Sequence, residues 1–295
     1  MKLRIACAIV VLGVLLTACA DATGPGDGST TPSPSGVIAH ASGAADLVLR
    51  VEYQGGFVAP SYSALTIPTF SLFGDGTLVT PGAQIEIYPG PALPAITATS
   101  IHEDGVQAIL GAALDAGLDH DARYTDMGHV MVADAATTVF TLSVNDHTYR
   151  TEVYALGELG GEQPDGMSPD EWTARQALGA FQQDLGTLVS WIPDGSVGDE
   201  TAYRASAARL LVSDYRPDDM LHQTAVDWPL DVPLSVFGAA TPALGADTRC
   251  GVLDGQDWDQ VGGLASTANQ LTPWVSNGAR HAIAFRPLLP DESGC

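Results

Sequence analysis

Two clusters of side chains in this sequence have the chemistry to bind an ion or a small ligand. The first falls between residues 120 and 134 and holds His120, Asp121, Asp126, His129 and Asp134. Imidazole and carboxylate groups are common ligands of zinc and similar ions, so this cluster is a candidate metal site. A solvated loop of an acidic protein would contain the same residues without binding a metal, and that alternative stays open.

The second cluster combines carboxylates with an aromatic residue: Asp254, Asp257, Trp258 and Asp259, with Trp274 further along the chain. A surface of this kind could bind a sugar or a cation. The structural alternative is the start of a helix, where aspartates are favoured by the macrodipole and Trp258 would be buried. The sequence leaves both interpretations open.

Local catalytic motifs are missing from the chain. There is no G-x-S-x-G, C-x-x-C or G-x-G-x-x-G, and His102-Glu103 lacks the second histidine of H-E-x-x-H. Lys2 is the only lysine, which excludes a Schiff-base lysine and a Walker A lysine from the exported part. No cofactor is predicted, although catalytic groups assembled from distant positions would leave no local trace.

The first residues have the layout of a secretory signal. Lys2 and Arg4 precede a short apolar run from Ile5 to Leu16. A run of about 12 residues is shorter than the roughly 20 that a helix needs to cross a bilayer. Residues 1–18 are therefore predicted to be a cleaved signal peptide.

The end of that run, Leu16-Thr17-Ala18-Cys19, resembles the lipobox of bacterial lipoproteins. The resemblance implies cleavage before Cys19, acyl chains such as palmitate on Cys19, and anchoring to the lipid bilayer on the extracytoplasmic face. That membrane is the cell membrane, or the outer membrane if the organism has one. An ordinary cleaved signal beside a chance cysteine is the alternative. Residues 19–45, rich in Gly, Ser, Thr and Pro, are predicted to form a flexible tether.

Charge narrows the set of partners. The chain has 12 Lys and Arg against 35 Asp and Glu, and loss of Lys2 and Arg4 with the signal would leave ten against 35, a net charge of −25. Such a protein repels phosphate polymers and anionic headgroups, so nucleic acid is excluded as a partner. The acyl chains are then the expected membrane contact.

Cys250 and Cys295 are the two cysteines left once the signal is removed and Cys19 is acylated. An even pair in an oxidising compartment predicts a disulfide. A free nucleophilic cysteine is the alternative.

Residues 46–160 read as an antiparallel sheet with a helix packed on it. A helix is predicted from a Ser100–Glu103 capping box to Gly117. Alternating apolar residues and turn signals predict strands at 47–53, 70–73, 77–79, 85–88, 140–144 and 149–153. The resulting hairpin–helix–hairpin order weakly resembles small exported bacterial domains of unknown function, which bring no catalytic motif.

Residues 161–295 are predicted to be a second mixed half, closed by the disulfide. A Ser168–Glu171 capping box starts a helix. The other predicted elements are strands at 209–212, 249–253 and 281–285 and a helix at 257–268. The fold class is therefore α+β, with two halves that either stand apart or pack as one unit.

Three functions fit these features. The first is a non-enzymatic, envelope-associated lipoprotein that binds a ligand or partner. The second is an extracellular hydrolase of peptide, ester or glycan, which requires a cleft where a Ser and a His, or two carboxylates, converge. The third is an inhibitor of an exported enzyme.

Overall fold

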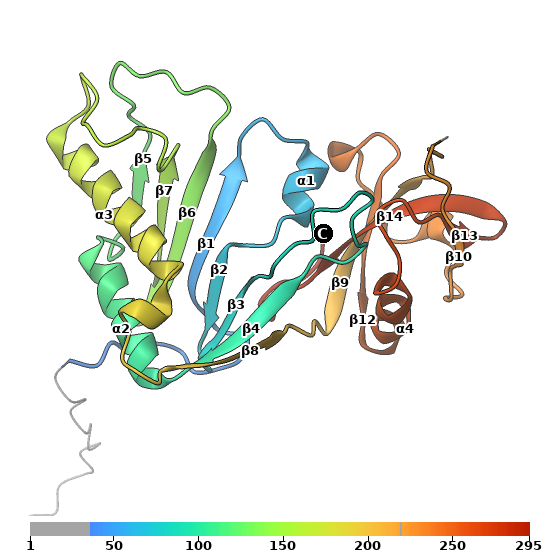
Figure 1. Ribbon diagram of the computed structural model, residues 1–295, viewed down its shortest axis with the longest axis horizontal. Helices are drawn as coiled ribbons and strands as arrows, with labels where there is room; N and C mark the ends of the chain where they lie inside the picture. Colours follow the sequence, from blue (N-terminus) through green and yellow to red (C-terminus); the bar gives the residue numbers. More distant parts are fainter. Residues whose placement is uncertain (1–35, 219) are drawn as a thin grey trace, which may run out of the picture. The chain divides into compact units, whose positions relative to one another are not determined.

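The computed structural model describes residues 36–218 and 220–295. Over these residues the fold is mixed, with two β-sheets and four α-helices (Figure 1). No helix in this part of the chain is both long and apolar enough to cross a membrane. The predicted signal peptide, the lipobox with Cys19, and the tether as far as residue 35 lie outside the described residues.

The first sheet has eight strands in the order β5-β7-β6-β1-β2-β3-β4-β8. Their bounds are β1 Leu47–Gly55, β2 Phe70–Phe73, β3 Thr77–Pro81, β4 Ile96–Ile101, β5 Ala122–Tyr124, β6 Ala136–Val144, β7 His147–Tyr154 and β8 Val197–Ala202. Neighbouring strands are antiparallel except for the β5–β7 pair. The last strand comes from beyond residue 160, so the sheet draws on both halves of the sequence.

Both predicted tight turns in this sheet join antiparallel strands. Asp75 lies between β2 and β3, and its Oδ1 accepts a hydrogen bond from the main-chain N–H of Thr77 at 2.9 Å. Asn145 and Asp146 join β6 to β7 with φ angles of 51° and 62°. Two successive positive φ values match the right-handed twist of the flanking strands, which explains why Asn and Asp occupy these positions.

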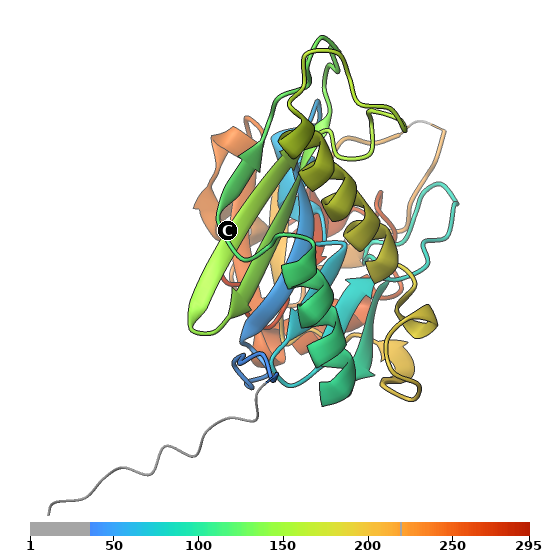
Figure 2. The ribbon, with the colours of Figure 1, turned by 90° about the vertical axis from the view of Figure 1, so that its left-hand side faces the viewer.

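Helices α2 (Glu103–Asp115) and α3 (Pro169–Leu185) cover one face of the first sheet (Figure 2). Their buried residues recur every three or four positions, which places one apolar stripe of each helix against the strands. These stripes share one core with side chains of the sheet: Val106, Ile109 and Leu110 of α2, Leu178 and Phe181 of α3, and Val48, Leu49, Phe140 and Leu142 of the strands.

Helix α3 begins as its sequence predicts, and α2 does not. The Ser168 hydroxyl accepts from the N–H of Glu171 at 3.2 Å. The Ser100–Glu103 capping box is wrong, because α2 begins at Glu103 after His102, which makes no side-chain cap. Ser100 pairs with Thr77 in the β3–β4 ladder, and the main-chain bonds of that ladder extend the strand past the serine.

The predicted strand at 85–88 is also wrong. These residues form part of an irregular loop, with Ile87 59% exposed and Tyr88 68% exposed. The side chain of Gln84 donates to the carbonyls of Gly82 and Ala95, both at 2.9 Å, and accepts from the N–H of Ala95. The side chain of Gln84 thus joins the two ends of this loop, which runs from β3 to β4.

The second sheet has six strands in the order β10-β13-β14-β9-β12-β11. Their bounds are β9 Ala207–Asp214, β10 Val226–Asp227, β11 Ala239–Ala240, β12 Arg249–Asp254, β13 Trp274–Ser276 and β14 Ala279–Pro287. The three strands predicted for this half lie within β9, β12 and β14. The remaining elements are α1 (Pro60–Leu65), α4 (Gly255–Ala265) and short 3-10 helices at Leu188–Ser190, Leu234–Val236 and Pro242–Leu244.

Aromatic side chains dominate the core of the second sheet. Trp274 is fully buried, and its ring lies edge-on to Trp228 at 6.2 Å and to Phe285 at 5.5 Å between centroids. Edge-to-face contacts of this kind suit the quadrupoles of the rings. Trp258 and Val261 of α4 complete this core, which fixes the helix against the sheet.

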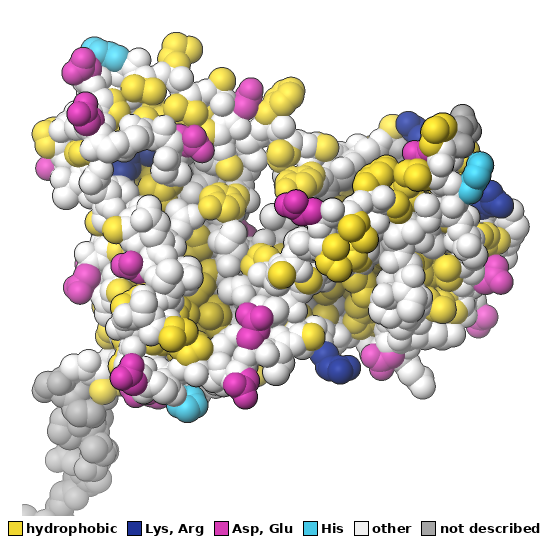
Figure 3. Space-filling model, in the orientation of Figure 1, with side chains coloured by type: hydrophobic (Ala, Val, Ile, Leu, Met, Phe, Trp, Pro, Cys, Tyr) yellow, Lys and Arg dark blue, Asp and Glu magenta, His cyan; other side chains and the backbone are white. Residues whose placement is uncertain are grey.

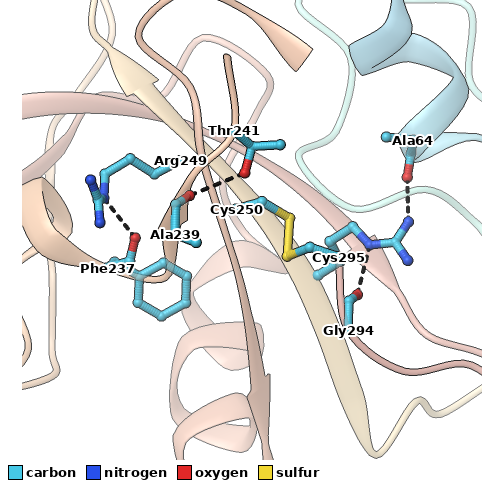
Figure 4. Close-up of a disulfide and its surroundings, with 9 residues drawn as sticks. Ala64, Phe237, Ala239, Thr241, Arg249, Cys250, Gly294 and Cys295 are labelled. Carbon is cyan, nitrogen blue, oxygen red and sulfur yellow. Dashed lines mark hydrogen bonds between the residues drawn. A yellow bond between two sulfur atoms is a disulfide. The ribbon is translucent and has the colours of Figure 1, made fainter. Parts of the chain in front are cut away.

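The segment from residue 288 to 295 connects the two sheets. Leu289 packs with Phe73 of the first sheet, and Asp291 forms an ion pair with Arg50 of β1 at 2.8 Å. The predicted Cys250–Cys295 disulfide is confirmed, with 6.0 Å between the Cα atoms (Figure 4). It binds this segment to β12 of the second sheet.

The folded region begins earlier than composition suggests. Ile38 exchanges two hydrogen bonds with the side chain of Gln107 on α2, at 2.8 and 2.9 Å, and packs against the first core. Ala39 likewise accepts from the N–H of Asn145 at 2.8 Å. The predicted end of the tether at residue 45 is therefore too late, and residues 38–295 form one compact unit.

Candidate functional site

The structure does not gather the His120–Asp134 cluster into a metal site. His120 Nδ1 lies 2.9 Å from Asp119 Oδ1, and this hydrogen bond lowers the pKa of Asp119. Asp121 accepts from the main-chain N–H of Arg150 at 2.8 Å. Each side chain therefore has a local partner of its own.

The other members of that cluster also serve the loops that carry them. Asp126 accepts from the N–H of Gly128 at 2.8 Å, and Asp134 has a positive φ of 63°. His129 donates its main-chain N–H to the carbonyl of Asp165 at 2.7 Å. Nowhere in residues 36–218 and 220–295 do three His, Cys, Asp or Glu side chains come together as a metal site.

The second cluster lies at the start of α4, and its tryptophans are not a surface platform. Asp254 precedes the helix without a side-chain cap, and Asp257 lies in the first turn. Trp258 is 7% exposed and donates its indole N–H to the carbonyl of Ala205 at 2.9 Å, while Trp274 is fully buried. Both rings are therefore part of the core, as the helix-start alternative requires. Trp258 and Asp259 nevertheless also line a groove.

This groove, called here the α4–β8 groove, has a volume of about 840 Å³. Three parts of the chain form most of it: residues 93–97 leading into β4, residues 200–205 of β8 and the link to β9, and α4. Gly82, Ala83 and Pro287 complete the lining. Its volume lies within the range of small-molecule and cofactor sites. Figure 3 shows apolar side chains gathered in a hollow on the side that carries these elements.

Most of the lining of the α4–β8 groove is apolar or small. The residues of this kind are Gly82, Ala83, Leu93, Pro94, Ala95, Ile96, Ala202, Ala205, Trp258, Gly262, Gly263 and Pro287. A second hollow of about 570 Å³ shares residues 93–95 and is lined by further aliphatic side chains, including Ile67 and Ile283. Residues 93–95 are therefore a ridge with an apolar hollow on either side.

The hydroxyl groups of the α4–β8 groove are largely bonded to the protein. Thr97 Oγ1 lies 3.1 Å from the hydroxyl of Thr80, and Thr201 donates to the carbonyl of Ala98 at 3.2 Å. Tyr203 donates to the carbonyl of Leu288 at 2.9 Å, and burial raises the pKa of Tyr203 to about 12. These groups hold the walls together and are poor candidates for nucleophiles.

The charged side chains of the groove are Glu200, Arg204 and Asp259. The described lining includes neither histidine nor cysteine, so it contains no Ser–His or Cys–His pair for nucleophilic catalysis. What the arrangement can do is enclose a ligand with apolar contacts and present a small excess of negative charge.

Beside the groove, a buried ion pair fixes the residues that follow β14. Arg286 is 4% exposed, and its Nη2 donates to Glu292 Oε1 at 2.7 Å while its Nε donates to the carbonyl of Thr66 at 3.2 Å. Burial opposes ionisation of Glu292, but the hydrogen bonds and charge of Arg286 outweigh it, so the pKa of Glu292 is lowered. The neighbouring Pro287 lines the groove and is held in place by this pair.

Of the residues that line the α4–β8 groove, the sequence singles out only two, Trp258 and Asp259, and leaves open whether they form a binding surface or the start of a helix. The remaining lining carries no motif, because it comes from segments that are distant in sequence. The one available signal was Gly262-Gly263 inside a predicted helix, where glycine is unfavourable and a packing or functional reason is expected. No family model, curated protein or solved structure matches this chain.

Proposed function

We propose that this chain is a lipoprotein, anchored by acyl chains on Cys19 to the extracytoplasmic face of a membrane, and that it binds a ligand in the α4–β8 groove without chemical conversion. The observation that carries the binding role is the apolar groove of about 840 Å³, whose lining holds no nucleophile–base pair. The Cys250–Cys295 disulfide supports an exported location, since such bonds persist in oxidising compartments.

We also propose that the hairpin–helix–hairpin arrangement of the first half is the rigid scaffold of this site. Strand β4, one wall of the groove, is paired with β3 of the first hairpin and leads directly into α2. The tether would let this scaffold present the groove away from the membrane.

Gly263→Leu is expected to block the groove. Gly263 is exposed on α4, lines the groove, and a Cβ added there meets no atom within 4 Å, so a leucine side chain would extend into the space a ligand needs. We expect binding of the neutral apolar dye N-phenyl-1-naphthylamine to weaken by at least about tenfold, equivalent to ~1.4 kcal/mol. Dye fluorescence is titrated with the full chain carrying Cys19→Ser, so that no acyl chain competes for the dye.

Gly111→Leu is the matched control for this experiment. Gly111 is also inside a helix, α2, and a Cβ there likewise meets no atom within 4 Å, but Gly111 does not line the groove. Both substitutions improve helix propensity by up to about 1 kcal/mol, so both variants should fold. Equal dye binding by the two variants, or no dye binding by the parent chain, would refute the groove as the site.

Cys19→Ser is expected to abolish acylation and release the protein from the membrane. Two or three acyl chains give stable anchoring, and no described helix provides a second anchor. Cells that express the parent chain or the variant are grown with an alkyne analogue of palmitate. The acyl label on the protein and the fraction of the protein that sediments with membranes are then compared. Electrophoretic mass serves as the control for an uncut signal peptide. Continued acyl labelling of the variant, or sedimentation of a variant of mature size, would contradict the anchor.

A further inference from the structure

Strand β8 is one of the two edge strands of the first sheet, opposite β5. It pairs with β4 on one side, and within the described residues no strand pairs with its other side. Its residues 199–202 are exposed. An edge of this kind offers unpaired main-chain groups as a template for one more strand.

The hydrogen bonds toward β4 show which main-chain groups are free. The N–H of Tyr203 donates to the carbonyl of Ile96 at 2.9 Å, and Thr201 pairs with Ala98 two residues earlier. In an antiparallel ladder the direction of the main-chain groups alternates along a strand. Since Tyr203 and Thr201 bond toward β4, the N–H and C=O groups of Glu200 and Ala202 point outward from the sheet.

These outward groups belong to residues that line the α4–β8 groove, and the opposite wall leaves room beside them. Glu200 and Ala202 both line the groove, as do Gly262, Gly263 and Ser266 of α4. Beside Gly262, Gly263 and Ser266 the helix carries only small side chains or none, which leaves space for an extended backbone between this part of α4 and β8.

The negative charge around the groove favours a ligand that carries positive charge. Asp199 and Glu200 are exposed on β8 and Asp259 lines the groove, against Arg204 alone. The whole chain carries a net charge of −23. A second copy of this chain pairing through β8 would bring these carboxylates against one another, which destabilises cross-strand pairing.

We propose that the ligand of the α4–β8 groove is an extended polypeptide segment bearing lysine or arginine residues, which adds to β8 as a further strand. This inference rests on the proposed function, because it names the ligand class of the same groove. Main-chain bonds to Glu200 and Ala202 would supply affinity, while alternate side chains of the segment would point to the apolar lining and to the carboxylates.

The test uses two capped hexapeptides, one of alternating lysine and valine and one of alternating glutamate and valine, titrated against the full chain with Cys19→Ser. The lysine–valine peptide should displace N-phenyl-1-naphthylamine, bind more weakly as ionic strength rises, and bind much more tightly than its acidic counterpart. Ala202→Pro removes an outward N–H and leaves the hydrogen bonds between β8 and β4 in place. It should weaken binding of the lysine–valine peptide by about tenfold.

Ala202→Ser is the comparison variant, because it changes the side chain at the same position but keeps the main-chain N–H, so it should weaken peptide binding much less than Ala202→Pro does. The inference is overturned if Ala202→Pro and Ala202→Ser bind alike, if the acidic peptide binds equally well, or if the dye binds and neither peptide displaces it. In the last case the groove remains a binding site for another ligand. Failure of the dye and of both peptides would instead overturn the proposed function together with this inference.

Discussion

Glu292→Ala is expected to destabilise the folded chain by about 3–5 kcal/mol, the typical cost of removing one partner of a buried ion pair. Arg286 is 4% exposed, and Glu292 binds both terminal nitrogens of its guanidinium. Without that carboxylate a nearly buried cation would keep only neutral carbonyl partners. The N–H of Leu289 would also lose the acceptor that it has at 2.8 Å.

Urea unfolding of the purified chain measures this loss. Glu162→Ala is the control, because Glu162 is exposed, and a surface change of this kind alters stability by no more than about 0.5 kcal/mol. A Glu292→Ala variant as stable as this control would show that the pair contributes nothing and that the segment after β14 is held by other contacts.

The Arg286–Glu292 pair also predicts the direction in which the stability of the folded chain changes with pH. The pKa of Glu292 in the folded chain lies below its ordinary value of 4.5. Its contribution to stability is therefore fully present above that value and is lost as the pH falls through it toward the lower folded pKa. The parent chain should lose stability in this acid range more steeply than Glu292→Ala, and parallel acid limbs for the two proteins would count against the assignment.

Removal of the disulfide is the second large effect. The Cys250→Ala, Cys295→Ala double variant is expected to lose about 2–5 kcal/mol, since the bond joins residues 45 positions apart and restrains the unfolded chain. It also holds Gly294, whose carbonyl accepts from Arg209 Nε at 3.0 Å, beside β9. Unfolding of the parent with and without reductant gives the same comparison without mutation.

The losses of stability caused by Glu292→Ala and by removal of the disulfide should not add. Glu292 and Cys295 restrain the same short segment, so once one is removed the other has less to hold in place. A triple variant lacking both should therefore lose less than the sum of the separate losses. Strict additivity would mean that residues 288–295 do not act as one structural unit.

Where an element could be predicted, a local signal decided it. The Asn145-Asp146 turn and the Ser168 cap need only their neighbours to form, and both occur as expected. The capping box at Ser100 obeyed the same local rule but failed, because pairing with β3 extends the strand through that residue. The alternation at 85–88 failed because no other strand in the described part of the chain pairs with these residues, which lie in the loop that the side chain of Gln84 closes.

The α4–β8 groove could not be predicted from local sequence patterns, and the reason is physical. Its walls come from residues near 95, 202 and 262, which approach one another only when α4 and β8 are in place. The carboxylates that looked like metal ligands accept main-chain N–H groups instead: Asp121 that of Arg150 on β7, and Asp126 that of Gly128 in its own loop. In an acidic chain such capping is common, and spacing alone does not distinguish it from ligation.

Site-specific photocrosslinking in the native membrane tests the central claim that the α4–β8 groove holds the ligand. A photoreactive p-benzoylphenylalanine replaces Arg204 in one full-length chain and Gly111 in another, both expressed in the organism's own envelope. Arg204 lines the groove and is exposed, and its side chain is already long, so the replacement leaves the space for a ligand open. A discrete covalent adduct is expected at position 204 and none at position 111, with the adduct mass giving the ligand class. Adducts at both positions alike, or at position 111 alone, would contradict this claim.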